Sequence, residues 1–116
     1  MKTNLITSIL FLIGTFTFSY CTSATTGGET ATFKVYGNCE MCKDRIEASL
    51  KGVKGVQSGV WDVESKIMKV VYDPKVISSD DIQKKIVAVG HDTEKLSASS
   101  TVYSGLPGCC HYDRKK

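Results

Sequence analysis

The sequence predicts a ferredoxin-like α+β fold, in which four antiparallel strands form one sheet and two helices cover one of its faces. Hydrophobic residues recur with strand-like and helical periods in the order β, α, β, β, α, β along the chain. The 116 residues are 41% hydrophobic and 23% charged, which is typical of one globular domain and argues against disorder. The net charge of +3 is too small and too interspersed to indicate a nucleic-acid partner.

The first half of the fold is predicted as a strand, a helix and a hairpin. Residues 32–36 alternate and are rich in β-branched and aromatic types, as in a strand, and they stop at Gly37. A helix follows, because apolar residues then recur at helical spacing at Cys42, Ile46, Leu50 and Val53. Residues 56–63 and 67–73 read as two strands of a hairpin, and in the second of them Met68, Val70 and Tyr72 should face the core.

The second half is predicted as a helix and a short last strand. Ser78, followed three residues later by Asp81, is typical of a helix start. Ile82, Ile86 and Val89 form the apolar stripe of this helix, and Gly90 ends it. The last strand, at 92–96, completes the predicted four-stranded sheet.

The N-terminal residues predict an export signal. The apolar stretch at 5–18 suits the hydrophobic region of a signal peptide and is shorter than the roughly 20 residues that span a bilayer. We therefore expect residues 1–24 to be a signal peptide, residues 25–30 a linker, and the mature protein to be periplasmic. The alternative is a lipoprotein anchored to the membrane through Cys21.

Cys39 and Cys42 form a C-x-x-C motif where the first strand ends and the first helix begins. The spacing brings both sulfur atoms to one point, and the helix dipole favours the thiolate form of Cys42. Thiolates are soft ligands that suit Cu(I) or Zn(II). By itself, the motif is also compatible with a thioredoxin-like redox pair or with half of a four-ligand zinc site.

The surrounding sequence resembles the heavy-metal-associated domain of copper chaperones, metal-pumping ATPases and the mercuric-ion-binding periplasmic protein. The similar segments are VYGNCEMCKDRIEASLKGVKGV, KIMKVVYDP and SSDDIQKKIVAVGHDTE. The resemblance places this domain at residues 31–97. It implies the ferredoxin-like fold and carries Cys39 and Cys42 over as the two metal ligands.

Met41 and His91 are further candidate ligands near the motif. The family often has a methionine ahead of the first cysteine, which is missing here, so we expect Met41 to pack beneath the loop instead of binding metal. His91 follows the second helix, whose end should lie beside the motif, and some similar chaperones use a histidine there as a ligand. We expect a solvent-facing His91, because two thiolates already satisfy linear Cu(I).

The tail at 98–116 contains Cys109, Cys110 and His111. Its stretch from residue 98 to 109 spans roughly 36 Å when extended, which exceeds the roughly 17 to 20 Å length of the preceding strand. We therefore hypothesise that the tail folds back, so that Cys109 or Cys110, and with them His111, joins Cys39 and Cys42. The alternatives are a solvated terminus or disulfides, either within the tail or between the tail and the motif.

Together these features predict an exported carrier of a soft metal ion that is not an enzyme. We expect Cu(I), followed by Hg(II) and Zn(II), to be bound and then passed to a metal transporter or to an acceptor protein with its own cysteine site. The carrier would be a monomer or a metal-bridged dimer. The alternative function is a small thiol-disulfide oxidoreductase, with Cys39 as the nucleophile and Cys42 as the resolving thiol.

Overall fold

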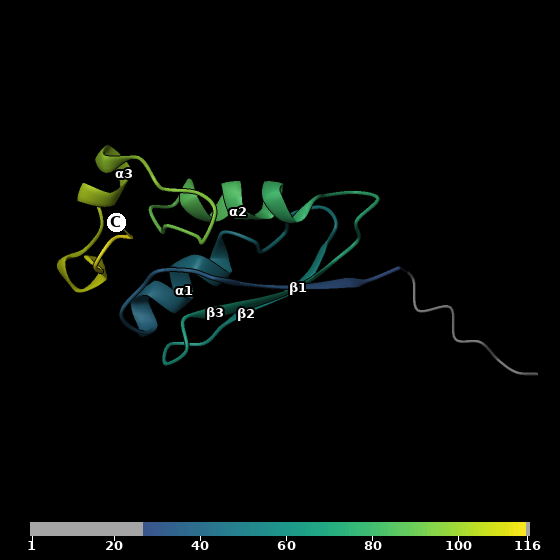
Figure 1. The fold of residues 1–116 in the computed structure, drawn as a ribbon, viewed down its shortest axis with the longest axis horizontal. Coiled ribbons are helices and arrows are strands. Elements are labelled where there is room, and N and C mark those ends of the chain that lie inside the picture. The colour runs from purple at the N-terminus through teal and green to yellow at the C-terminus, as the bar shows by residue number, and fades with distance from the viewer. Residues whose placement is uncertain (1–26, 116) are drawn as a thin grey trace, which may run out of the picture.

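The computed structural model describes residues 27–115 as a three-stranded antiparallel sheet that shares one core with its helices (Figure 1). The strands lie in the order β1-β3-β2. The elements are β1 (Glu29–Lys34), α1 (Glu40–Ala48), β2 (Val56–Trp61), β3 (Ile67–Tyr72), α2 (Ser79–Val87), α3 (Ser100–Ser104) and a 3-10 turn, η1 (Gly108–Cys110).

The core forms where the alternating positions of the sheet meet the apolar stripes of the helices. The predicted inward positions of β3, namely Met68, Val70 and Tyr72, are all buried. Ile46 of α1 and the isoleucines of α2 are fully buried in the same cluster. The prediction of these core faces is confirmed.

The start of α2 also agrees with the sequence. Ser78 caps the helix by accepting a hydrogen bond from the backbone N–H of Asp81 at 3.1 Å. After the helix ends, Gly90 adopts a φ of 104°, which glycine reaches without the steric cost that a side chain adds.

The predicted fourth strand at 92–96 is reduced to a single antiparallel bridge between Val35 and Thr93. The backbone N–H of Thr93 bonds instead to the carbonyl of Leu96 at 2.8 Å, so the chain turns at the point where a strand would continue. The side chain of Thr93 donates a buried bond to Gln83 of α2 at 2.6 Å. The ferredoxin-like α+β arrangement therefore holds, but a full four-stranded sheet is wrong for the described residues.

The N-terminal boundary of the domain also differs from the prediction. Glu29 and Thr30, which composition assigns to the linker at 25–30, pair with Tyr72 and Val71 as the first residues of β1. The predicted signal peptide at 1–24, together with Cys21, lies outside the described residues.

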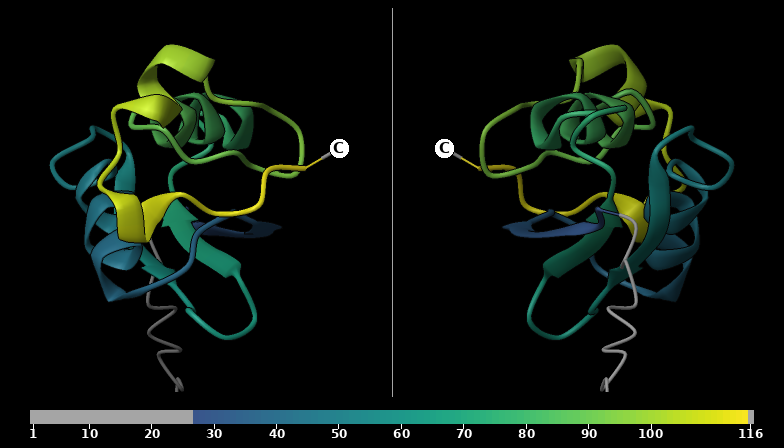
Figure 2. Two further views of the ribbon diagram at one scale, coloured as in Figure 1. Left: turned by 90° about the vertical axis from the view of Figure 1, so that its left-hand side faces the viewer. Right: turned by 90° about the vertical axis from the view of Figure 1, so that its right-hand side faces the viewer.

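The C-terminal segment packs into the domain core and is not a solvated tail. Leu106 and Tyr112 belong to the main core cluster, and Leu106 fits against Gly90, where an added Cβ would lie 3.0 Å from it. The Tyr112 hydroxyl donates to the Gly90 carbonyl at 2.7 Å and accepts from the Asp92 N–H at 2.8 Å. Figures 1 and 2 show the segment, in yellow, covering one end of the domain.

A buried ion pair fastens the end of this segment. The Asp92 side chain is fully buried and receives two hydrogen bonds from Arg114, at 3.0 and 2.8 Å, and one from the backbone N–H of Ala98 at 2.7 Å. Burial acts to raise the pKa of Asp92, but these bonds outweigh it and hold the pKa below its ordinary value.

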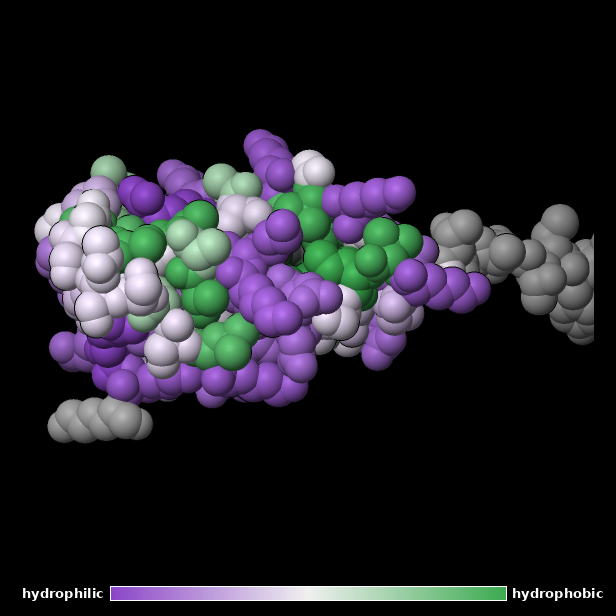
Figure 3. Space-filling view, turned by 90° about the horizontal axis from the view of Figure 1, so that it is seen from above, coloured by the Kyte–Doolittle hydropathy of each residue, from purple (hydrophilic) through white to green (hydrophobic). Residues whose placement is uncertain are grey.

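Hydrophobic side chains reach the outer surface in several places. The face in Figure 3 shows hydrophobic areas, in green, between hydrophilic ones. In the part of the chain that the structure describes, the exposed large hydrophobic residues come from five different segments: Met41, Val60, Ile67, Val76 and Val102. Within residues 27–115, no helix has both the length and the hydropathy needed to cross a membrane.

Arg114→Met should lower the free energy of unfolding by about 2 kcal/mol, because it leaves a buried carboxylate without its charged donor. Denaturant unfolding measures the change. The matched control is Lys84→Met, whose partner Asp81 is exposed like Lys84 itself, and its effect should stay within about 0.5 kcal/mol.

The effect of Arg114→Met should also depend on pH. Since the folded-state pKa of Asp92 is lowered, its carboxylate stabilises the fold above the unfolded-state pKa of about 4. That contribution is lost as the pH falls through the lower folded-state pKa, so the stability gap between wild type and variant should narrow in acid. A gap that stays constant down to pH 2 would contradict the role given to Asp92.

Candidate metal centre

The loop between β1 and α1 is held down by close packing against a tryptophan. A Cβ added to Gly37 would lie 2.9 Å from the Trp61 ring and 3.1 Å from Cβ of Cys42, so only glycine lets the backbone come this near. Trp61 is fully buried and donates its indole N–H to the Val35 carbonyl at 3.1 Å. The loop therefore rests on a rigid support.

Cys39 and Cys42 face each other at the N-terminus of α1. Their sulfur atoms are 3.6 Å apart, and the backbone N–H of Asn38 donates to the Cys42 sulfur at 3.3 Å. Cys39 is half-buried, whereas Cys42 is fully buried. The pKa of the Cys39 thiol is lowered, chiefly by the backbone N–H of Cys42. The arrangement favours a thiolate at the position that solvent can reach.

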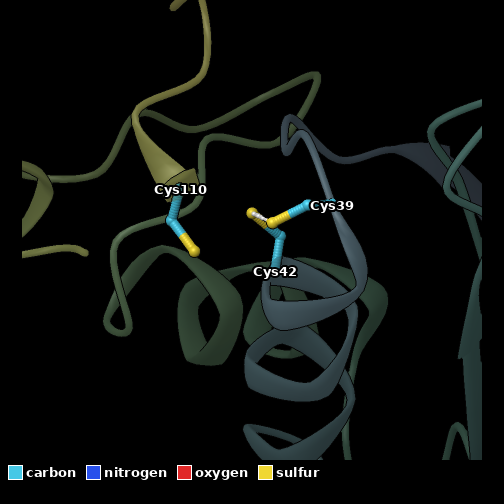
Figure 4. A group of neighbouring side chains, drawn as sticks. All are labelled: Cys39, Cys42 and Cys110. Carbon is cyan, nitrogen blue, oxygen red and sulfur yellow. Dashed lines mark hydrogen bonds between the residues drawn. The ribbon is translucent and has the colours of Figure 1, made fainter. Parts of the chain in front are cut away.

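A third sulfur comes from the C-terminal segment. Cys110, in η1, is fully buried, and its sulfur lies with those of Cys39 and Cys42 in a group whose members are all within 4.8 Å of one another (Figure 4). Burial, followed by the contact with Cys42, raises the pKa of the Cys110 thiol to about 12. The hypothesis that the tail returns to the motif therefore agrees with the geometry.

Cys109 also contacts the motif, but its sulfur is not part of the three-sulfur group. Its carbonyl accepts hydrogen bonds from the Cys39 thiol and from the Asn38 side-chain amide, both at 3.5 Å. Its own exposed thiol donates to the Met41 sulfur at 3.2 Å. Of the two adjacent tail cysteines, only Cys110 belongs to the three-sulfur group.

The expectation for Met41 is wrong. Its side chain is 51% exposed on the first turn of α1, because Trp61 already fills the space beneath the loop. Sequence reasoning missed this role of Trp61. The available signal was that the single tryptophan of the chain stands in the second predicted strand, close to the motif in the expected sheet.

His91 is fully buried, which corrects the expected solvent-facing histidine. Its Nδ1–H donates to the Tyr36 carbonyl at 2.8 Å, and its ring stacks on Tyr112 at 5.3 Å between centroids. Burial lowers its pKa, and the charge of Arg45 lowers it further. The Nε2 atom is buried with no hydrogen-bond partner within residues 27–115, but it does not belong to the sulfur group.

His111 also lies outside the group. It is exposed, and its ring stacks on Tyr103 at 5.2 Å between centroids. The tail folds back as hypothesised, yet the histidine that follows the cysteines does not join the sulfur group.

Comparison with known proteins assigns the domain. The sequence model of the heavy-metal-associated domain matches residues 32–92. The zinc-transporting ATPase of Synechocystis sp. is 37% identical over 65 residues, which are 56% of this chain and 9% of the ATPase. The chain thus spans about a tenth of the length of the curated relatives it matches.

Solved structures support the same assignment. The CopZ metallochaperone superposes with a TM-score of 0.54 at 26% identity, covering 56% of this chain and 98% of that one. Oxidized MerP from Ralstonia metallidurans CH34 has a TM-score of 0.54 at 22% identity over 58% of this chain and 94% of MerP, which supports the fold alone. The resemblance stated from the sequence is confirmed.

Gly37→Ala should destabilise the domain by about 1 to 3 kcal/mol, because the added methyl group meets the buried Trp61 ring and must displace the loop. Thermal or denaturant unfolding of the metal-free protein measures this loss. The control is Gly108→Ala in the turn that carries Cys110, since a Cβ there meets no atom within 4 Å. Equal stability of both variants would contradict the supporting role of Trp61.

Proposed function

Because this chain belongs to the heavy-metal-associated domain family, we propose that it binds a soft metal ion through Cys39 and Cys42 and passes it to another protein. The observation that supports binding most directly is the 3.6 Å separation of the two sulfur atoms at the start of α1. Two thiolates at one point are a soft donor set, which suits Cu(I) and, after it, Hg(II) or Zn(II). The metal ion is the cargo of this protein.

Transfer follows from the unequal exposure of the two cysteines. The half-buried Cys39 can exchange its place with a thiolate of an incoming protein, while the buried Cys42 keeps its bond to the ion. The ion then passes through an intermediate bound to thiolates of both proteins and is never released to water. The partner is therefore a metal transporter or an acceptor that presents a cysteine site of its own.

The choice of ion rests on coordination chemistry. The names of the relatives include a zinc-transporting ATPase and a copper-transporting ATPase, so membership of the family leaves the ion open. Low-coordinate Cu(I) needs only two thiolates, whereas structural Zn(II) sites take four ligands. On the C-x-x-C pair alone, Cu(I) is the first choice.

Export is part of the proposal. Residues 1–24 have the pattern of a signal peptide, so the carrier would work in the periplasm. Mass spectrometry of the protein purified after expression in a bacterial host tests this point. A chain that begins at Thr25 supports a free periplasmic carrier, a lipid on Cys21 supports the anchored form, and an unprocessed chain contradicts export.

Cys39→Ser and Cys42→Ser should each weaken Cu(I) binding by more than about 100-fold, because each removes one of the two ligands on the motif. Competition with a chromophoric Cu(I) chelator under anaerobic conditions measures the affinity. Cys109→Ser is the matched control, since its thiol is exposed and outside the sulfur group.

Two results would contradict the proposed function. One is a reduced wild-type protein that takes up none of Cu(I), Zn(II) and Hg(II) in stoichiometric amount. The other is metal-independent turnover of a disulfide substrate that is lost in Cys39→Ser, which would identify a thiol-disulfide oxidoreductase instead.

A further inference from the structure

We propose that Cys110 is a third metal ligand, so that the C-terminal segment completes a three-thiolate site. This inference rests on the proposed function, because it takes Cys39 and Cys42 as the other two ligands. It goes beyond that function by assigning a donor from outside the matched region at 32–92, and with it a different coordination number.

The spacing of the sulfur atoms fits three-fold coordination better than two-fold. Metal–thiolate bonds are about 2.3 Å long, so a linear ion needs its two sulfurs about 4.6 Å apart, whereas a trigonal ion needs about 4.0 Å between each pair. The sulfurs of Cys39 and Cys42 are 3.6 Å apart, and all three sulfurs lie within 4.8 Å of one another. Trigonal binding therefore requires the smaller displacement of the C-x-x-C pair.

The fold fixes Cys110 from both sides. Before it, Leu106 is buried against Gly90, and the Cys110 N–H donates to the Pro107 carbonyl at 2.8 Å. After it, the buried Tyr112 is hydrogen-bonded through its hydroxyl, and its carbonyl accepts from the Tyr103 hydroxyl at 2.7 Å. The sulfur of Cys110 is thus held in place before any metal arrives.

A buried cysteine often serves only as a small hydrophobic residue. The surroundings of Cys110 indicate a metal ligand instead, because its sulfur lies within 4.8 Å of two other sulfurs that come from a distant part of the chain. The carbonyl of Cys109 also bonds to the Cys39 thiol and to Asn38, so the segment docks on the metal-binding loop itself.

The net charge of the site indicates which ions should bind more tightly when the third ligand is present. Three thiolates carry a charge of −3, which leaves −2 with Cu(I) and −1 with a divalent ion. Two of the three sulfurs belong to fully buried residues, and burying net charge is costly. The three-thiolate site should therefore favour a soft divalent ion such as Hg(II) more than the C-x-x-C pair alone does.

X-ray absorption spectroscopy of the reduced, anaerobic protein with one equivalent of Hg(II) counts the sulfur neighbours directly. We expect three in wild type and in Cys109→Ser, and two in Cys110→Ser and Cys110→Ala. Cys110→Ser should weaken Hg(II) binding by at least about 10-fold. In a parallel competition experiment, it should weaken Cu(I) binding by a smaller factor.

The controls separate this inference from effects on folding and assembly. Thermal unfolding of metal-free Cys110→Ala shows whether this variant still folds. The sulfur count in wild type tests the inference even if the variant does not fold. Sedimentation of the metal-loaded protein should give a monomer. A metal-bridged dimer would indicate that the third sulfur comes from a second copy of the chain.

Two sulfur neighbours in monomeric wild type, or three that persist in Cys110→Ser, would overturn the role of Cys110 while leaving the proposed function intact. Loss of binding in Cys39→Ser, with Hg(II) affinity in Cys110→Ser equal to that of wild type, would do the same. Undiminished binding in Cys39→Ser would instead overturn the proposed function.

Discussion

The buried carboxylate of Asp92 joins the C-terminal segment to the rest of the domain. Its oxygens hold Arg114 and the backbone of Ala98, while its own N–H donates to the Tyr112 hydroxyl. Asp92 directly follows His91, whose Nδ1–H donates to the Tyr36 carbonyl just ahead of the metal-binding loop, so these bonds tie the segment to the chain that borders this loop. Together with the packing of Leu106 and the hydrogen bonds of Tyr112, this attachment fixes the position of Cys110 relative to Cys39.

The docked segment changes what the C-x-x-C motif offers to an incoming protein. Cys42 and Cys110 are fully buried, and Cys109 places its carbonyl against the Cys39 thiol. Cys39 is thus the most accessible residue of the three-sulfur group. Under the proposed function, ligand exchange begins at Cys39, and the ion stays on the buried thiols until a partner thiolate approaches from the exposed side.

Local patterns in the sequence predicted the features that depend on local structure. The alternation through β3, the Ser78 cap and the C-x-x-C at a helix start each follow from a few neighbouring residues. The predictions that were wrong depend on contacts between residues that are far apart in the sequence. The fourth strand stops because Thr93 bonds to Gln83 and Leu96. Met41 is exposed because Trp61 fills the space expected for it. His91 is buried because Tyr112 stacks on it.

The tail shows most clearly where sequence reasoning ends. Chain length established that Cys109 and Cys110 could both reach the motif, but it could not show which of the two sulfurs would join Cys39 and Cys42. The choice is made by residues on either side, since Leu106 and Tyr112 are both buried and together fix the orientation of η1 between them. With that orientation, the Cys110 sulfur lies in the three-sulfur group and the Cys109 thiol contacts Met41 instead. Leu106 and Tyr112, which are not metal ligands, therefore decide which thiol meets Cys39 and Cys42.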